Sequence, residues 1–260
     1  MPELPEVETL CRQLNRMIAG KKILAVEVLD PRLGNVPALR GERVESVSRR
    51  GKWMQIRMES GLTAALHLRM SGRLLWQADG APPDPLHTRL AISFPEGRLI
   101  LIDPRRFAVF CVQPDNAPPA PLANPLEGMP ARRLREIAEG RRLPIKSFLM
   151  DQRFIAGIGN IYACEILFRA AVDPRRPAGS LTAAEWRKVE KAAAAVLLRA
   201  VDCRGTTVSD WRDLFGVSGT NQDHLEVYSR EGEPCRSCGG RIERLTMGGR
   251  GTWFCPSCQK

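Results

Sequence analysis

The sequence predicts an α+β fold of several domains, and three observations support this. Residues 20–112 contain short segments of alternating apolar and polar residues separated by Gly and Pro, a pattern typical of a β-sandwich or barrel. From Leu126 onward the apolar residues follow a helical spacing. The C-terminal end carries two Cys-x-x-Cys pairs, the spacing of a small metal-bound hairpin.

An N-terminal domain is expected over residues 1–113. It begins with PEVETLCRQLNRMIAG, which predicts a helix because Pro5 suits a first helical position, Glu6 and Glu8 suit the positive end of the helix dipole, and Gly20 suits a stop. The strand-like segments that follow are KILAVEVLD, RVESVSRRGKWMQIRM, LTAALHLRMSGRLLW, RLAISF and RLILIDPRRFAVFCV. We therefore expect a β-sandwich capped by one helix.

A linker and a helical domain come next. Residues 114–125, PDNAPPAPLANP, are rich in Pro and short side chains, as linkers are. Residues 126–227 then contain the helical segments ARRLREIAEG, FLMDQRFIAGIGNIYACEILFRAA and LTAAEWRKVEKAAAAVLLRAV. Ser180 or Thr182 is expected to cap the last of these helices.

The last segment, residues 228–260, is expected to be a zinc ribbon. Its cysteines have the spacing C-x2-C-x16-C-x2-C and are Cys235, Cys238, Cys255 and Cys258. This spacing matches a tetrahedral site for one structural Zn2+, and two disulfides are the alternative. Between the pairs, RIERLTM and TWF read as strands joined by GGRG, which places Arg250 near the tip of a hairpin.

The charge of the chain points to a polyanionic partner. The 260 residues carry a formal net charge of +10, and 32 of the 39 basic residues are Arg, the better bidentate ligand of phosphate. A GC-rich genome would also favour Arg over Lys. No apolar run is long enough to span a membrane, and the N-terminus lacks the pattern of a secretory signal, so a cytoplasmic protein that associates with the nucleoid through DNA is expected.

Seven collinear strings resemble the formamidopyrimidine-DNA glycosylase/endonuclease VIII family. They are MPELPEVETL, RRGKWM, HLRMSG, DPRRFA, PIKSFLMDQ, AGIGNIYACEILFRA and VYSREGEPC, followed by the cysteine pairs. Leu4 and Val7 resemble the formamidopyrimidine-DNA glycosylase branch. The resemblance implies that the helical region is a helix-two-turns-helix domain and that the protein is a monomeric, bifunctional repair enzyme acting on duplex DNA with an oxidised purine or an abasic site.

The resemblance also implies catalytic roles for four residues. After loss of Met1, Pro2 would be an N-terminal secondary amine that attacks the sugar C1′. Glu3 would transfer protons, and Glu6 would orient the helix start and the nucleophile, although it also suits a plain helix N-terminus. Lys52 would contact the phosphate near the lesion.

Further residues are implied as DNA contacts. Met70, Arg105 and Phe107 would fill the space left by the everted nucleotide, although Met70 and Phe107 would also suit a core. The remaining contacts implied are His67, His87, Lys146, Asn160 and Arg250. For Lys146, a solvated lysine at a helix start is the alternative.

Departures from the family pattern bear on the substrate. Glycine is usual in the family where Arg69, Ala108 and Ser229 stand, and an aromatic residue is usual near Thr220 and Asn221, in a loop expected to close over the everted base. Two alternatives therefore stay open. One is an endonuclease VIII-type glycosylase for oxidised pyrimidines, and the other is a zinc protein that binds damaged DNA without catalysis.

Overall fold

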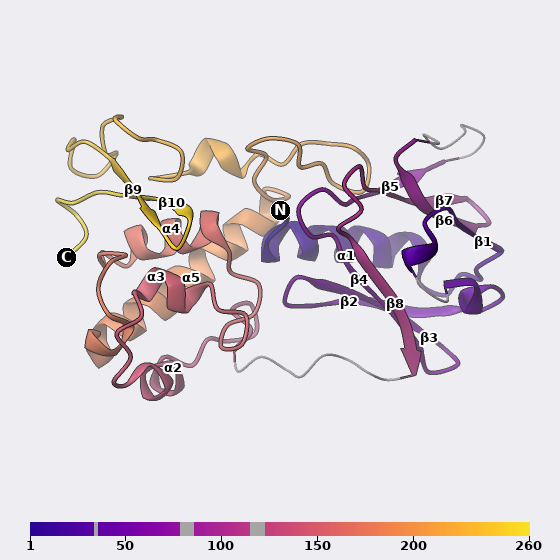
Figure 1. The fold of residues 1–260 in the computed structure, drawn as a ribbon, viewed down its shortest axis with the longest axis horizontal. Coiled ribbons are helices and arrows are strands. Elements are labelled where there is room, and N and C mark those ends of the chain that lie inside the picture. The colour runs from indigo at the N-terminus through magenta and orange to yellow at the C-terminus, as the bar shows by residue number, and fades with distance from the viewer. Residues whose placement is uncertain (34–35, 79–85, 115–122) are drawn as a thin grey trace. The chain divides into compact units, whose positions relative to one another are not determined.

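The computed structural model describes residues 1–33, 36–78, 86–114 and 123–260. The chain forms two compact units (Figure 1). Unit 1 comprises Met1–Ala120 and Cys203–Thr220, and unit 2 comprises Pro121–Asp202 and Asn221–Lys260. Residues 115–122 of the expected linker lie outside the described residues. Residues 203–220, which follow the last predicted helix, thus pack with the N-terminal part of the chain.

Helix α1 (Leu4–Ile18) opens unit 1. Pro5 lies in its first turn and Glu6 is its N3 residue, and Gly20 follows the helix with φ of 76°, as the sequence predicts. Leu10, Leu14 and Ile18 are fully buried, because their spacing places them on one face of the helix. That face joins the apolar core of the unit.

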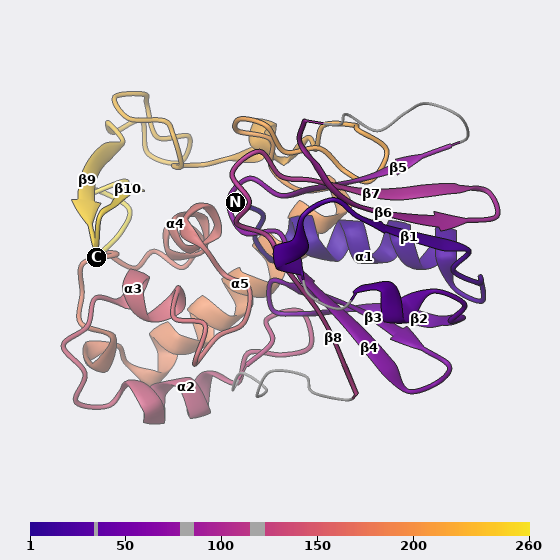
Figure 2. The ribbon, with the colours of Figure 1, turned by 45° about the vertical axis from the view of Figure 1, so that its right-hand side comes forward.

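Two four-stranded antiparallel sheets make up the rest of unit 1, which confirms the β-sandwich (Figure 2). The first sheet has the order β1 (Ala25–Val28), β6 (Thr88–Phe94), β7 (Gly97–Ile102) and β5 (Arg73–Gln77). The second has the order β2 (Val44–Arg50), β3 (Trp53–Met58), β4 (Leu62–His67) and β8 (Val109–Pro114). Short 3-10 helices span Pro31–Leu33 and Val36–Leu39. Both sheets and α1 contribute side chains to one core, so the loops at the sheet ends are held by a rigid body.

Unit 2 contains the four remaining helices of the described chain. They are α2 (Ala131–Ala138), α3 (Ile145–Leu149), α4 (Asn160–Arg169) and α5 (Ala183–Asp202), with 3-10 turns at Ala178–Ser180 and Asn221–His224. Thr182 caps α5, since its hydroxyl accepts from the Glu185 N–H while the Glu185 carboxylate accepts from the Thr182 N–H. No helix in the described ranges has both the length and the apolar character needed to cross a membrane.

The C-terminal hairpin consists of β9 (Glu243–Met247) and β10 (Arg250–Phe254). Gly248 and Gly249 form its two-residue turn with φ of 57° and 72°, the left-handed values that a tight hairpin of this kind requires. Ile242 and Phe254 are buried, and Ile242 packs in a cluster with Cys164 and Phe168 of α4. The hairpin therefore rests on α4 within unit 2.

Candidate active site and nucleic-acid interface

The N-terminus of α1 holds the candidate catalytic residues in a fixed arrangement. Pro2 is half-buried, whereas Glu3 and Glu6 are only 3% and 1% exposed. The Glu6 carboxylate accepts a hydrogen bond from the Glu3 N–H at 2.8 Å, and the two residues form a reciprocal capping box. The residue after Pro2 is thus held by the helix itself.

Glu6 also ties α1 to the distant segment 203–220 of unit 1. Its second carboxylate oxygen accepts from the Thr206 N–H at 2.8 Å. Gly205 precedes this contact, and a Cβ there would lie 2.7 Å from the Glu6 oxygen, so no larger residue fits without a shift. Glu6 is therefore more than a helix-dipole partner. Thr206 is a residue that sequence reasoning missed, because nothing near it in the sequence indicates a partner 200 positions away.

Lys52 lies in the turn between β2 and β3. It is buried, at 8% exposure, and follows Gly51, whose φ is 60°. The side chain of the neighbouring Arg49 is buried as well. Its guanidinium donates to the Glu8 carboxylate at 2.8 Å and to the Gly51 carbonyl at 3.0 Å, and its side chain is 3% exposed. The Arg49 guanidinium is thus paired within the protein.

The turn between β4 and β5 exposes Met70, whose side chain is 55% exposed. His67, at the base of this turn, is 8% exposed and lies edge-on against Trp53 with ring centroids 5.0 Å apart. Its Nδ1 accepts from the Arg69 N–H at 3.0 Å, which requires a neutral imidazole with its proton on Nε2. Burial, reinforced by the charges of Arg69 and Lys52, lowers the pKa of His67 to about 4.

The loop between β7 and β8 exposes Phe107, at 48%, with the Arg105 guanidinium 5.0 Å from its ring centroid. His87, half-buried before β6, accepts at its carbonyl from the Asp103 N–H at 2.9 Å, so its segment lies beside this loop. Met70 and Phe107 are therefore solvent-exposed apolar side chains on loops, and the interpretation of both as core residues is wrong.

Arg69 and Ser229, two of the three positions where the family usually has glycine, have φ of 53° and 63°. Left-handed values cost a residue with a Cβ about 1 kcal/mol, which explains why glycine suits them. Ala108 is not among the residues with positive φ. The structure offers no backbone reason for glycine at that position.

In unit 2, Lys146 and Asn160 converge on the hairpin. The Lys146 ammonium, at 1% residue exposure, donates to the Gly251 carbonyl at 2.9 Å and to the Thr252 hydroxyl at 2.7 Å. The Asn160 amide, at the first residue of α4, donates to the same Gly251 carbonyl at 3.1 Å. Lys146 is thus not a solvated lysine, and both residues fix the strand that begins with the exposed Arg250.

A buried carboxylate holds the chain that enters the hairpin. Glu165 of α4 is 2% exposed and accepts from the backbone N–H groups of Glu226, Val227 and Tyr228 at 2.8–3.0 Å. Burial raises the pKa of Glu165, while the three N–H donors oppose that rise. Helix α4 therefore carries Asn160 at its start and anchors residues 226–228 further along. Sequence reasoning missed Glu165, because an isolated acid in an apolar helix gives no sign of its partners.

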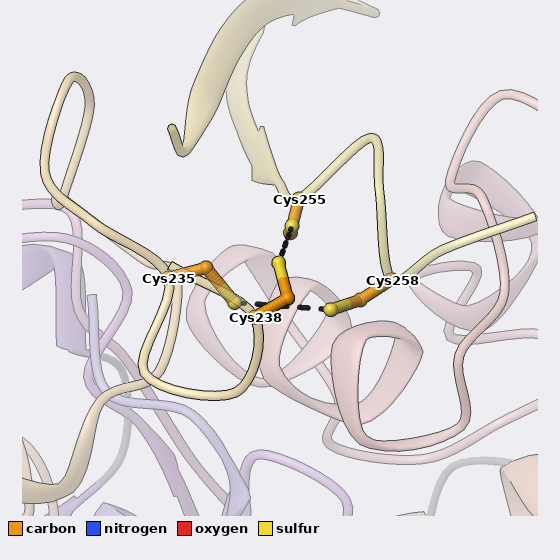
Figure 3. Close-up of side chains that lie close together, drawn as sticks. All are labelled: Cys235, Cys238, Cys255 and Cys258. Carbon is orange, nitrogen blue, oxygen red and sulfur yellow. Dashed lines mark hydrogen bonds between the residues drawn. The ribbon is translucent and has the colours of Figure 1, made fainter. Parts of the chain in front are cut away.

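The four C-terminal cysteines meet in one cluster (Figure 3). All four sulfurs lie within 4.8 Å of one another, with 3.9 Å between Cys235 and Cys258 and 3.5 Å between Cys238 and Cys255. A tetrahedral Zn2+ with bonds of about 2.3 Å places its sulfurs about 3.8 Å apart, so the donor set fits zinc. The thiols are free and these distances far exceed a disulfide bond, so the two-disulfide alternative is wrong.

Comparison with known proteins gives matches along the whole chain. Residues 1–110 match the family model described as formamidopyrimidine-DNA glycosylase N-terminal domain. Residues 119–211 match the formamidopyrimidine-DNA glycosylase H2TH domain, and residues 232–260 match a zinc finger found in FPG and IleRS.

Individual proteins are similar over the same length. A formamidopyrimidine-DNA glycosylase of Roseiflexus sp. (strain RS-1) is 41% identical, with 100% of both chains covered. A mutant Lactococcus lactis FPG, solved with a Fapy-dG containing DNA, is 30% identical with a TM-score of 0.90 over 100% of both chains. The Lactococcus lactis Fpg solved with an abasic site containing DNA is 30% identical with a TM-score of 0.90 over 99% of both chains.

Proposed function

Because this chain belongs to the formamidopyrimidine-DNA glycosylase family, we propose that it excises oxidised purines, such as 8-oxoguanine and formamidopyrimidines, from duplex DNA and then cleaves the strand. The observation that carries this proposal is the N-terminus, where Pro2 precedes a buried Glu3 held by Glu6. A protein that only bound DNA would need neither an amine nor a proton carrier there. Relatives solved with Fapy-dG and abasic-site DNA support the substrate class.

The reaction begins once Met1 has been removed. The Pro2 nitrogen lone pair attacks the sugar C1′, the bond from C1′ to the base breaks, and Glu3 supplies a proton as the base leaves. The adduct still has a closed sugar ring. The ring opens when the Pro2 nitrogen gives up its proton, the C1′–O4′ bond breaks and O4′ is protonated, which leaves an iminium whose positive charge acidifies the C2′ proton. Glu3 takes that proton, and the electron pair expels the 3′ phosphate. Loss of the 5′ phosphate follows in the same way and leaves a gap of one nucleotide.

Access to C1′ requires the damaged nucleotide to leave the stack. Met70 and Phe107 supply exposed apolar side chains to fill the vacancy, and Arg105 supplies hydrogen bonds to the partner base. Lys52 would contact the phosphate beside the lesion. His87 would lie near the DNA backbone. The buried His67 would act indirectly, by holding the turn that carries Met70.

Unit 2 would bind the phosphate backbone of the DNA. Arg250 would bind a phosphate from the start of the hairpin strand. Lys146 and Asn160 contact the next residues, Gly251 and Thr252, and would fix this strand beside the phosphate. A structural Zn2+ held by the four cysteines would stabilise a hairpin too small to hold itself by an apolar core. We propose that residues 1–113, 126–227 and 228–260 are the functional segments of a monomer that acts in the cytoplasm.

Borohydride trapping tests the chemistry. Processed protein should become covalently attached, at Pro2, to a duplex containing 8-oxoguanine or an abasic site, because reduction fixes the iminium. A Pro2→Leu variant is the control, since a bulky second residue keeps Met1 in place and blocks the amine. If processed protein binds the duplex without trapping, the chain is a damage binder and the proposal fails.

A lesion panel separates the two substrate classes. Cleavage of 8-oxoguanine duplexes in preference to thymine-glycol duplexes is the expected result. The reverse preference would show an enzyme of the endonuclease VIII type.

A further inference from the structure

Asp103 lies at the end of β7 with 0% exposure, directly before the loop that carries Arg105 and Phe107. Both of its carboxylate oxygens are used. One accepts from the Ser71 hydroxyl at 2.5 Å, and the other accepts from the Ala108 N–H at 2.6 Å. Each donor belongs to a different loop of unit 1, so this single side chain joins the two loops.

The two donors lie directly beside the exposed apolar residues in the sequence. Ser71 follows Met70, and Ala108 follows Phe107, so the carboxylate holds the residue next to each exposed apolar side chain. The first loop is further closed by a hydrogen bond from the Gly72 N–H to the Leu68 carbonyl at 3.0 Å. A Cβ on Gly72 would lie 2.5 Å from that carbonyl oxygen, so this close turn depends on glycine.

The Asp103 backbone extends the connection to a third segment. Its N–H donates to the His87 carbonyl at 2.9 Å, and its carbonyl accepts from the buried Arg89 guanidinium at 2.8 Å. One residue therefore contacts the segments of Met70, His87 and Phe107. These are the three places in the first sheet and its loops where DNA contacts are proposed.

We propose that Asp103 is a positioning residue for base eversion, an inference that rests on the proposed function. Its carboxylate sets the spacing of the Met70 and Phe107 loops before DNA arrives, so less conformational freedom is lost when both side chains enter the duplex. Aspartate suits this role because it offers two acceptors to two donors. Asparagine is nearly the same shape, but with its oxygen on the Ala108 N–H its NH2 group faces the Ser71 hydroxyl, which must turn from donor to acceptor, so the charge-assisted contact with the first loop is lost.

The test compares Asp103→Asn and Ser71→Ala with the wild type and with Ser46→Ala, a serine on β2 outside these loops. Eversion is followed by the fluorescence of 2-aminopurine placed beside 8-oxoguanine in a duplex, and excision is measured in a single turnover. Trapping on a single-stranded abasic oligonucleotide measures the Pro2 chemistry without any helix to open. Melting temperatures show whether each variant is folded.

Asp103→Asn should slow eversion and duplex excision on the order of 10–100-fold, the usual effect of small misplacements, while single-strand trapping stays within about twofold of wild type. Ser71→Ala should slow duplex excision roughly 2–10-fold, through loss of one hydrogen bond. It should add less in the Asp103→Asn background than in the wild type, because that variant has already lost the charge-assisted contact with Ser71.

Equal losses in both assays would mean that Asp103 only stabilises the fold, and the proposal would be overturned. Unchanged eversion in a folded Asp103→Asn protein would overturn it as well. Failure of the proposed function looks different, since the wild type itself would then not trap on either oligonucleotide.

Discussion

At the scale of single residues, features that depend on neighbouring residues could be predicted from the sequence. Contacts between residues far apart in the sequence could not. Helix α1 begins at Leu4, one residue before the predicted Pro5, and ends shortly before Gly20, because a helix start and stop depend on neighbouring residues. The contact of Glu6 with Thr206 joins residues 200 positions apart, and Lys146 reaches Thr252 across 106 positions. Side-chain pairs at such separations are set by packing, so the roles of these residues could be named by resemblance but their partners could not.

His67 illustrates a role that depends on its surroundings. Its pKa is about 4 in the folded chain and near 6.5 when unfolded, so acid favours the unfolded state. The His67 contribution to stability is fully present above pH 6.5 and is lost as the pH falls to about 4. Urea unfolding at pH 7.5, 6 and 5 should therefore show a decline that includes roughly 2 kcal/mol from this group.

His67→Asn should remove that part of the decline, because an amide oxygen can accept from the Arg69 N–H without titrating. His224 is exposed, and His224→Asn is the matched control that should leave the pH dependence unchanged. An identical pH dependence in wild type and His67→Asn would show that His67 titrates normally.

At the scale of elements, the hairpin was predictable as a unit but its attachment was not. The hairpin depends on two local features, the cysteine spacing and the turn at Gly248 and Gly249, and both could be recognised in the sequence. Its fixation depends on α3 and α4, whose Lys146 and Glu165 are buried charges that hydropathy alone places on the surface. Such charges are retained only where every donor or acceptor is matched.

Lys146→Met should accordingly destabilise unit 2 by about 2 kcal/mol, since the Thr252 hydroxyl and the Gly251 carbonyl lose a charged donor in a buried site. The measurement is the midpoint of urea unfolding, together with the rate at which zinc is lost to a coloured chelator. Lys188→Met, at an exposed position of α5, is the control. A wild-type midpoint for Lys146→Met would contradict the anchoring role.

At the scale of the whole molecule, the net charge of +10 predicted a polyanionic partner, but the structure shows that the basic residues differ in availability. The Arg49 guanidinium forms an ion pair with the Glu8 carboxylate, whereas Arg250 is exposed on the hairpin strand. Composition counts both equally. A count of charges therefore overstates how many phosphates the protein can neutralise, and burial has to be known before the sum has meaning.

The salt dependence of DNA binding measures that distinction. Affinity for an abasic-site duplex should fall linearly with salt on logarithmic axes, and Arg250→Ala should reduce the slope by about 0.9, the value for one phosphate contact. Arg57→Ala removes an exposed arginine of β3 that pairs with Glu45, and it should leave the slope unchanged. Equal slopes for wild type and Arg250→Ala would mean that Arg250 meets no phosphate.

The buried start of α1 also fixes when the protein can mature. Residues 3–7 are all buried, so only Met1 and Pro2 project from the folded chain. An aminopeptidase must draw an extended N-terminus into its own pocket, and a helix packed from Leu4 onward cannot supply one. We therefore expect Met1 to be removed on the nascent chain, before α1 docks. A preparation in which synthesis exceeds this processing should contain folded molecules that keep Met1, and intact mass measures their share.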